Sequence, residues 1–137
     1  MTALPPPRRK GPLRPLGFGV LAALLWGGWA LYVNASAGAG PAARATLAQA
    51  LLSFSATAGL SFVLERLFRL GRTPLRGFFI AAVGTTSISA STMATVHAIV
   101  GTPRILATVG PTVALGATFF TVYAWGLRSA ASRNLPS

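Results

Sequence analysis

Four long stretches without a charged residue constrain this chain more than any other feature of its sequence. They cover residues 16–33, 47–64, 77–100 and 105–127, and none of them contains Asp, Glu, Lys or Arg. A helix needs about 20 apolar residues to cross a hydrocarbon core of roughly 30 Å, so each stretch is close to the length of a membrane span. Helices of a soluble bundle would carry charges on their outer faces. The pattern therefore predicts an all-α integral membrane protein.

Proline and glycine separate the apolar stretches and set the expected boundaries. Helices can extend past the apolar core, so we expect spans at about 16–33, 45–68, 77–100 and 104–127, within one transmembrane domain of residues 16–128. A basic, proline-rich tail (1–15) and a short tail (129–137) flank it. In the tight turn Gly101-Thr102-Pro103, we expect Gly101 to end one helix and Thr102 to cap the next. Short turns make neighbouring helices antiparallel, so we predict an antiparallel four-helix bundle.

Basic residues are distributed unevenly between the segments that connect the spans. Ten of the twelve lie before residue 16, between the apolar stretches 47–64 and 77–100, or after residue 127, whereas only Arg44 and Arg104 lie in the other two connections. Cytoplasmic loops are enriched in Lys and Arg, which predicts a multi-pass protein of the bacterial inner (plasma) membrane with both termini in the cytoplasm. The residues expected to contact anionic lipid headgroups are Arg66, Arg69, Arg72 and Arg76.

The formal net charge of +11 does not predict a nucleic-acid partner. A basic patch is the electrostatic footprint of nucleic-acid binding, but here the cationic groups flank apolar spans, where they interact with lipid headgroups and fix the topology. The expected partners are therefore membrane lipids, together with a second copy of the chain or another membrane protein.

The first span resembles a signal peptide, because basic residues precede it and Ala35-Ser36-Ala37 follows it. Its apolar run of 18 residues is longer than the 7 to 15 of a signal sequence, and Trp29 and Tyr32 suit a membrane interface. These features favour a span that is retained. Cleavage would leave three spans and an external amino terminus.

Two of the spans carry polar residues in a pattern that two interpretations fit. In span 45–68 polar side chains recur at every fourth position, and each step of four advances about 40° around the helix, so they form a slowly turning seam. Span 77–100 is rich in hydroxyl groups. The candidate residues are Gln49, Ser53, Thr57, Ser61, Thr85, Ser89 and Thr92. In the first interpretation these residues form a packing seam, because small and hydroxylated residues let helices pack closely. In the second they form the wall of a polar route through the protein.

The only histidine and the only acid lie far apart. His97 belongs near the outer end of its span, where Thr102 and Arg104 follow, and the three form a candidate anion contact on the outer face. Glu65 lies at the cytoplasmic end of span 45–68 and precedes Arg69 by four residues, the spacing of a helical ion pair. The distance between Glu65 and His97 is roughly 30 Å, which prevents their cooperation in acid–base chemistry.

The scarcity of acid–base and nucleophilic side chains argues against catalysis. With one Glu, one His and neither Asp nor Cys, the chain has too few groups for a metal site or a nucleophilic triad, so we expect no enzyme activity, no metal and no cofactor. The expected function is binding of lipid-like molecules or support of partner membrane proteins. The alternative is a small oligomeric transporter or channel whose hydroxyl-lined route lies between spans 45–68 and 77–100.

Overall fold

The computed structural model describes the backbone of residues 13–133, with side chains from residue 16 onward. Four α-helices follow one another: α1 (Leu13–Asn34), α2 (Ala39–Arg69), α3 (Pro74–Ile99) and α4 (Ile105–Arg133), with a 3₁₀ turn η1 (Ala35–Ala37) after α1. All four are long and apolar enough to cross a membrane, and residues 13–133 contain no strand. The prediction of an all-helical chain with four such helices is therefore confirmed. Helix α4 continues to Arg133, so the part of the expected tail up to that residue is helical, and residues 1–12 and 134–137 lie outside the described part.

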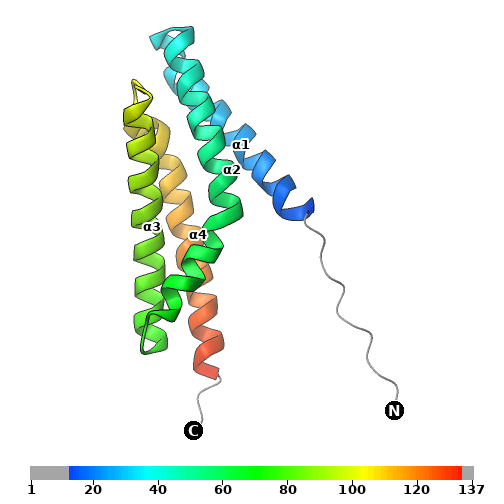
Figure 1. Ribbon diagram of the computed structural model, residues 1–137, viewed down its shortest axis with the longest axis vertical. Helices are drawn as coiled ribbons and strands as arrows, with labels where there is room; N and C mark the ends of the chain where they lie inside the picture. The colour runs from blue at the N-terminus through cyan, green and yellow to red at the C-terminus, as the bar shows by residue number, and fades with distance from the viewer. Residues whose placement is uncertain (1–12, 134–137) are drawn as a thin grey trace, which may run out of the picture.

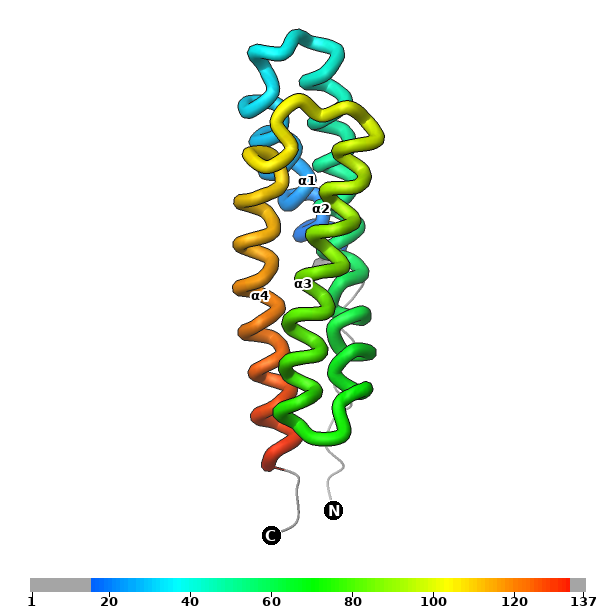
Figure 2. The backbone as a smooth tube through the Cα atoms, turned by 90° about the vertical axis from the view of Figure 1, so that its left-hand side faces the viewer, coloured from blue at the N-terminus to red at the C-terminus, as the bar shows by residue number. Residues whose placement is uncertain are grey.

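The connections between the helices lie at two opposite ends of the molecule (Figure 1). The α1–α2 and α3–α4 connections share one end, which we call the α3–α4 end. The α2–α3 connection and the last turn of α4 share the other, which we call the α2–α3 end (Figure 2). Helices α3 and α4 run side by side with α2, whereas α1 leans away from α4 toward its own amino terminus (Figure 1). The bundle is therefore closed at the α3–α4 end and wedge-shaped below it.

Most of the buried apolar residues are small, and many of the large apolar residues face outward. The alanines at positions 30, 45, 81 and 124 are fully buried, whereas Leu24, Ile99 and Leu106 are 70%, 78% and 89% exposed. Lipid tails are as apolar as leucine, so there is no hydrophobic force that drives large side chains inward, and close packing of small residues holds the helices together. This distribution is the one expected of helices that lipid surrounds.

Close contact between α1 and α2 depends on two glycines. A Cβ at Gly27 would lie 3.2 Å from the Ala50 Cβ, and a Cβ at Gly19 would lie 2.8 Å from the Phe54 ring. Helix α1 therefore follows α2 even where it has left α4.

The two connections at α3 have identifiable caps. Thr73 accepts a hydrogen bond from the Arg76 N–H, and Pro74 is the first residue of α3, a position where its missing N–H costs nothing. At the other end, Gly101 has a φ of 69°, and the Thr102 N–H donates to the His97 carbonyl, which is the Schellman arrangement. The expectation that Gly101 ends this helix agrees with that geometry.

The start of α4 differs from the expected cap. The Thr102 hydroxyl pairs with the His97 ring, and the Arg104 N–H donates instead to Asn34 Oδ1 of α1 at 3.1 Å. The first turn of α4 is therefore capped by a residue 70 positions earlier in the chain, because the bundle brings the end of α1 beside it.

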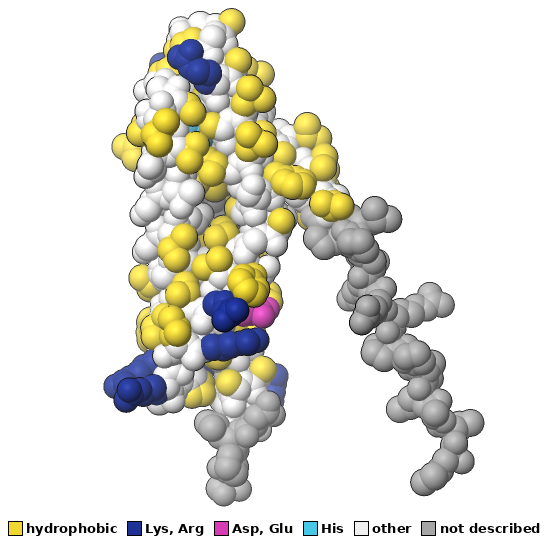
Figure 3. Space-filling view, in the orientation of Figure 1, with side chains coloured by type: hydrophobic (Ala, Val, Ile, Leu, Met, Phe, Trp, Pro, Cys, Tyr) yellow, Lys and Arg dark blue, Asp and Glu magenta, His cyan; other side chains and the backbone are white. Residues whose placement is uncertain are grey.

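Basic side chains gather at the two ends of the face that Figure 3 shows, and the belt between them shows none. Arg66, Arg69, Arg72 and Arg76 are all exposed near the α2–α3 end. The Arg66 guanidinium also lies 5.2 Å from the centre of the Phe62 ring.

Candidate functional site

A chain of buried hydrogen bonds joins α2, α3 and α4 at the level of Gln49. His97 Nε2 lies 2.7 Å from Gln49 Oε1, and His97 Nδ1 lies 2.7 Å from the Thr102 hydroxyl. The Gln49 amide nitrogen donates to the Thr112 hydroxyl at 2.9 Å and to the Ser53 hydroxyl at 3.5 Å. Gln49 and His97 are fully buried. A buried polar group is costly without partners, so these contacts fix the relative positions of the three helices. We call Gln49, Ser53, His97, Thr102 and Thr112 the Gln49 network.

The donor and acceptor of each hydrogen bond in the Gln49 network follow from the contact between His97 and Gln49. Because Gln49 Oε1 is an acceptor, His97 Nε2 carries the proton, and in the neutral ring His97 Nδ1 then accepts from the Thr102 hydroxyl. The Gln49 amide uses its hydrogens on Thr112 and Ser53. The network therefore ends at two hydroxyl groups that accept a hydrogen bond and keep their own protons to donate.

Asn34 fastens the end of α1 to the start of α4. Its side-chain amide donates to the Thr108 hydroxyl at 2.9 Å and its oxygen accepts from the Arg104 N–H, while Thr108 donates to the Arg104 carbonyl. Asn34 and Thr108 are fully buried. These bonds hold α1 to α4 at the α3–α4 end only.

A second joint between α1 and α4 depends on Pro111. A proline has no N–H, so Pro111 leaves the carbonyl of Ala107, four residues earlier, without its helical donor. The indole N–H of Trp29 donates to that carbonyl at 3.0 Å. A proline inside a helix frees a carbonyl wherever it stands, and the structure shows which side chain satisfies this one.

This joint gives a first testable prediction. Trp29→Phe should lower the free energy of unfolding by about 1–2 kcal/mol, because the Ala107 carbonyl loses its donor. In a Pro111→Ala background the restored N–H supplies that carbonyl, so the same change should cost less than half as much. A double-mutant cycle, measured by unfolding in mixed micelles with increasing SDS, gives the coupling. Equal costs in both backgrounds would contradict this pairing.

A cavity of about 550 Å³ lies in the wedge that α1 leaves open. All four helices contribute to its wall: α1 provides Ala22 and Trp26, α3 provides Ser89 and Met93, and α2 and α4 provide the rest. The lining residues from α2 and α4 are Ser53, Ala56, Thr57, Leu60, Ser61, Thr112, Leu115, Gly116, Thr118, Phe119, Phe120 and Val122. None of these described lining residues carries a charge. The volume lies within the usual range for a small-molecule site.

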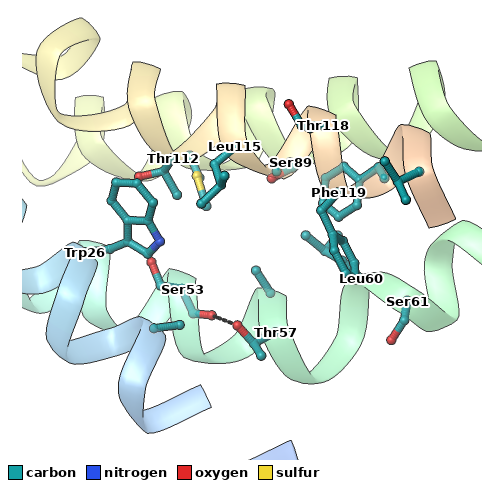
Figure 4. A pocket seen from close by; sticks show the side chains of 16 residues that line it. Trp26, Ser53, Thr57, Leu60, Ser61, Ser89, Thr112, Leu115, Thr118 and Phe119 are labelled. Atoms are coloured by element: carbon teal, nitrogen blue, oxygen red, sulfur yellow. Dashed lines mark hydrogen bonds between the residues drawn. The ribbon is translucent and has the colours of Figure 1, made fainter. Parts of the chain in front are cut away.

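The two ends of the cavity differ in chemistry. Figure 4 shows Trp26, Ser53 and Thr112 at one end, with the indole nitrogen of Trp26 on the side of its ring that faces the cavity. Leu60 and Phe119 lie at the opposite end (Figure 4). Ser53 and Thr112 belong to the Gln49 network, so this buried network is continuous with the polar end of the cavity.

The structure places the seven candidate residues of the polar seam in different surroundings. Gln49 and Ser53 belong to the Gln49 network, and Ser53, Thr57, Ser61 and Ser89 line the cavity. Thr57 donates to the Ser53 carbonyl of its own helix. Thr85 is fully buried, and its hydroxyl has no hydrogen-bond partner among the described residues, whereas Thr92 is exposed. The seam therefore supplies one wall of a cavity that α4 and α1 complete, and α3 contributes less to it than the hydroxyl count suggests.

The three candidate anion contacts do not share one exposed surface. His97 and Thr102 are buried and bonded to each other, whereas the Arg104 side chain is exposed. Both ring nitrogens of His97 already have protein partners, so an external anion would have to displace one of them.

Glu65 has a different partner from the one that its spacing suggests. Its carboxylate accepts a hydrogen bond from the Tyr123 hydroxyl of α4 at 2.8 Å. The spacing in the sequence instead suggested Arg69 of the same helix as its partner. The contact joins α2 to α4 near the α2–α3 end. Among residues 13–133, no three His, Cys, Asp or Glu side chains form a group that could hold a metal ion.

Several residues that build the site carry no signal in the sequence. Asn34 stands in a short sequence that resembles a glycosylation acceptor, Trp26 and Trp29 resemble ordinary interfacial aromatics, and Thr108 and Thr112 are single hydroxyls in an apolar helix. Only Pro111 predicts part of the site from the sequence, because a proline inside a helix leaves the carbonyl four residues earlier without its helical donor.

Comparison with known proteins adds no relative to this description: no protein-family model, no curated protein and no solved structure matches the chain.

Proposed function

We propose that this chain is a non-enzymatic binding protein of the bacterial inner membrane that holds a lipid-like molecule in the cavity between its four helices. One observation carries the proposal: a cavity of about 550 Å³ lies among helices apolar enough to span a membrane, and no charged residue lines it within the described part of the chain. The protein acts by binding or accommodating its ligand and not by changing it.

The depth of the cavity supports a ligand that comes from the bilayer. On α2 its wall runs from Ser53 to Ser61, between Arg44 at one end of the helix and Arg66 at the other. Charged side chains of membrane helices seek the interfaces, so the cavity lies midway between the two headgroup layers. A lipid reaches this depth by moving sideways, whereas a water-soluble molecule would first have to cross a headgroup layer.

The proposed orientation rests on the charges at the two ends. The α2–α3 end carries Arg66, Arg69, Arg72 and Arg76, all exposed, and the α3–α4 end carries Arg44 and Arg104. By the positive-inside rule the α2–α3 end lies in the cytoplasm. The bundle is then antiparallel with both termini inside, and the four arginines contact anionic headgroups.

Selectivity for a lipid-like ligand has to come from shape and hydrogen bonds. Lipid tails are as apolar as the cavity wall, so burial of an alkyl chain in the cavity gains little over the surrounding bilayer. The polar end at Ser53 and Thr112 and the aromatic wall at Phe119 are the features that distinguish the cavity from lipid.

Photocrosslinking tests the proposal directly. A long-chain fatty methyl ester with a diazirine in its tail should label the purified protein in lipid nanodiscs at residues that line the cavity, Leu60 and Phe119 among them. Ala56→Phe fills the cavity from α2 and should reduce this labelling at least tenfold. Ala58→Phe is the matched control, since Ala58 is exposed on the same helix and does not line the cavity. Equal labelling in the two variants would refute the proposal.

A transporter or channel is the second candidate function. Ser53, Thr57 and Ser61 line the cavity on its α2 side, as a polar route along this helix requires. Solute flux through proteoliposomes that Ser53→Ala abolishes would favour this function. The accessory role predicts a different result. A defined membrane protein, or a second copy of the chain, would then copurify with the wild type and with Ala56→Phe alike.

A further inference from the structure

We infer that the molecule held in the cavity is a neutral amphiphile with one uncharged oxygen acceptor, such as an ester, ketone or ether oxygen, and one apolar tail. The acceptor lies at the Trp26, Ser53 and Thr112 end, and the tail lies toward Leu60 and Phe119. This inference rests on the proposed function and adds the class and orientation of the ligand.

The polar end of the cavity presents donors. Ser53 and Thr112 each accept a hydrogen bond from Gln49 and keep their own hydroxyl protons. The described residues provide no acceptor for those protons, whereas Thr46, Thr57 and Thr108 donate theirs to the carbonyl four residues earlier. Ser53 is 3% and Thr112 is 8% exposed. A buried donor without an acceptor is costly, so an acceptor on the ligand stabilises the complex.

The indole N–H of Trp26 adds a donor to the same end. Its nitrogen lies on the cavity side of the ring (Figure 4). An indole nitrogen donates and cannot accept, and a hydroxyl that already accepts from an amide still donates. The three groups together therefore favour an oxygen acceptor over a ligand group that only donates.

The charge of the ligand is limited by its surroundings. No described cationic side chain lines the cavity, and the arginines of the described helices lie near their ends. A charged group at the centre of a bilayer is costly unless it is paired. A carboxylate or phosphate would have no counter-ion among the lining residues, so the head of the ligand is neutral.

The length of the cavity suits a single tail. Its wall extends over nine residues of α2 and eleven of α4, from Ser53 to Ser61 and from Thr112 to Val122. At a rise of 1.5 Å per residue these stretches are about 12 and 15 Å long, roughly half of a hydrocarbon core of about 30 Å. Leu60 and Phe119 lie at the end distant from the donors (Figure 4).

Competition against the photocrosslink separates the head from the tail. The competitors share one chain length and differ in the head: an alkane, a methyl ester and a carboxylate. The ester should compete about threefold to tenfold better than the alkane, the effect of one or two hydrogen bonds inside a membrane. The carboxylate should compete no better than the alkane.

The variants assign that advantage to two side chains. The double variant Ser53→Ala/Thr112→Val should lose the preference for the ester and keep competition by the alkane. Ser53→Thr, which keeps a hydroxyl, should retain the preference. Thr118→Val is the matched control, because Thr118 lines the cavity but donates to the Ala114 carbonyl of its own helix. Each protein is first shown to elute as a single monodisperse peak.

The failures of the two proposals are distinguishable. If ester and alkane compete equally in the wild type, or if the double variant keeps the preference, the inferred head group is wrong and the binding function stands. If added phospholipid competes with the photocrosslinking probe as well as the ester does, the occupant is an ordinary phospholipid tail and the inference is overturned. If no probe labels the cavity, the binding function itself is wrong.

Discussion

Replacing Gln49 with leucine is expected to lower the free energy of unfolding by about 2–4 kcal/mol. The change removes the hydrogen bonds of Gln49 with His97, Thr112 and Ser53 and leaves their polar atoms buried. Each interhelical hydrogen bond in a membrane contributes about 0.6 kcal/mol and at most about 1.7, and an unsatisfied buried group adds its own cost. Circular dichroism during unfolding in mixed micelles with increasing SDS measures the loss.

A cycle with His97 identifies the cause of this loss. His97→Leu alone should also destabilise the protein, but the double variant Gln49→Leu/His97→Leu should cost at least 1 kcal/mol less than the sum of the single variants, since neither partner is then left unpaired. Thr86→Val is the matched control, because Thr86 donates only to the Ala82 carbonyl of its own helix. Strictly additive costs would show that the Gln49–His97 bond does not hold these helices together.

A methyl group at Gly71 is expected to disrupt the α2–α3 connection, with a loss of about 3 kcal/mol or more. A Cβ at Gly71 would fall on the backbone nitrogen of Gly77, and a Cβ at Gly77 would lie 2.6 Å from the Phe68 carbonyl oxygen. Backbone atoms cannot rotate away as a flexible side chain can, so Gly71→Ala forces α2 and α3 apart, and overpacking of this kind costs 1–3 kcal/mol or more. The same SDS titration measures the effect, and Gly77→Ala should behave similarly.

Gly59→Ala, inside α2, should give the opposite result. A Cβ there meets nothing within 4 Å, and alanine is about 0.8–1.0 kcal/mol more favourable than glycine inside a helix. We therefore expect Gly59→Ala to be neutral or stabilising. If Gly71→Ala were equally harmless, the close approach of the two backbones at this connection would be wrong.

The hydrogen-bond partners of the site could not be predicted from the sequence, for a simple physical reason. Gln49 and His97 are 48 positions apart, and Asn34 and Arg104 are 70 apart. A polar residue in a membrane helix must find a partner, but its sequence does not say on which helix. The fourfold spacing of Gln49, Ser53, Thr57 and Ser61 identified a common face of α2, and three of these residues do line the cavity. The opposite wall from α4 has no comparable pattern.

Hydroxyl content was a weaker guide than spacing. Span 77–100 has many hydroxyls, yet Thr92 is exposed and Thr86 bonds its own helix. Serine and threonine can satisfy themselves on the carbonyl four residues earlier, so their number does not predict a polar route. Glu65 shows the same limit, because its spacing indicated Arg69 but the bundle places the Tyr123 hydroxyl against it.

The sequence by itself determined that the chain forms four apolar helices long enough to span a membrane, because hydropathy and the exclusion of charge are properties of consecutive residues. It also indicated where α3 ends and that Pro111 frees a carbonyl, since glycine and proline act on their own backbone. Only the tertiary structure decided that Trp29 and Asn34 fasten α1 to α4 at one end, that the helices separate below, and that a cavity with a donor-rich end lies between them. These features depend on contacts between distant residues, and such contacts exist only once the helices have packed.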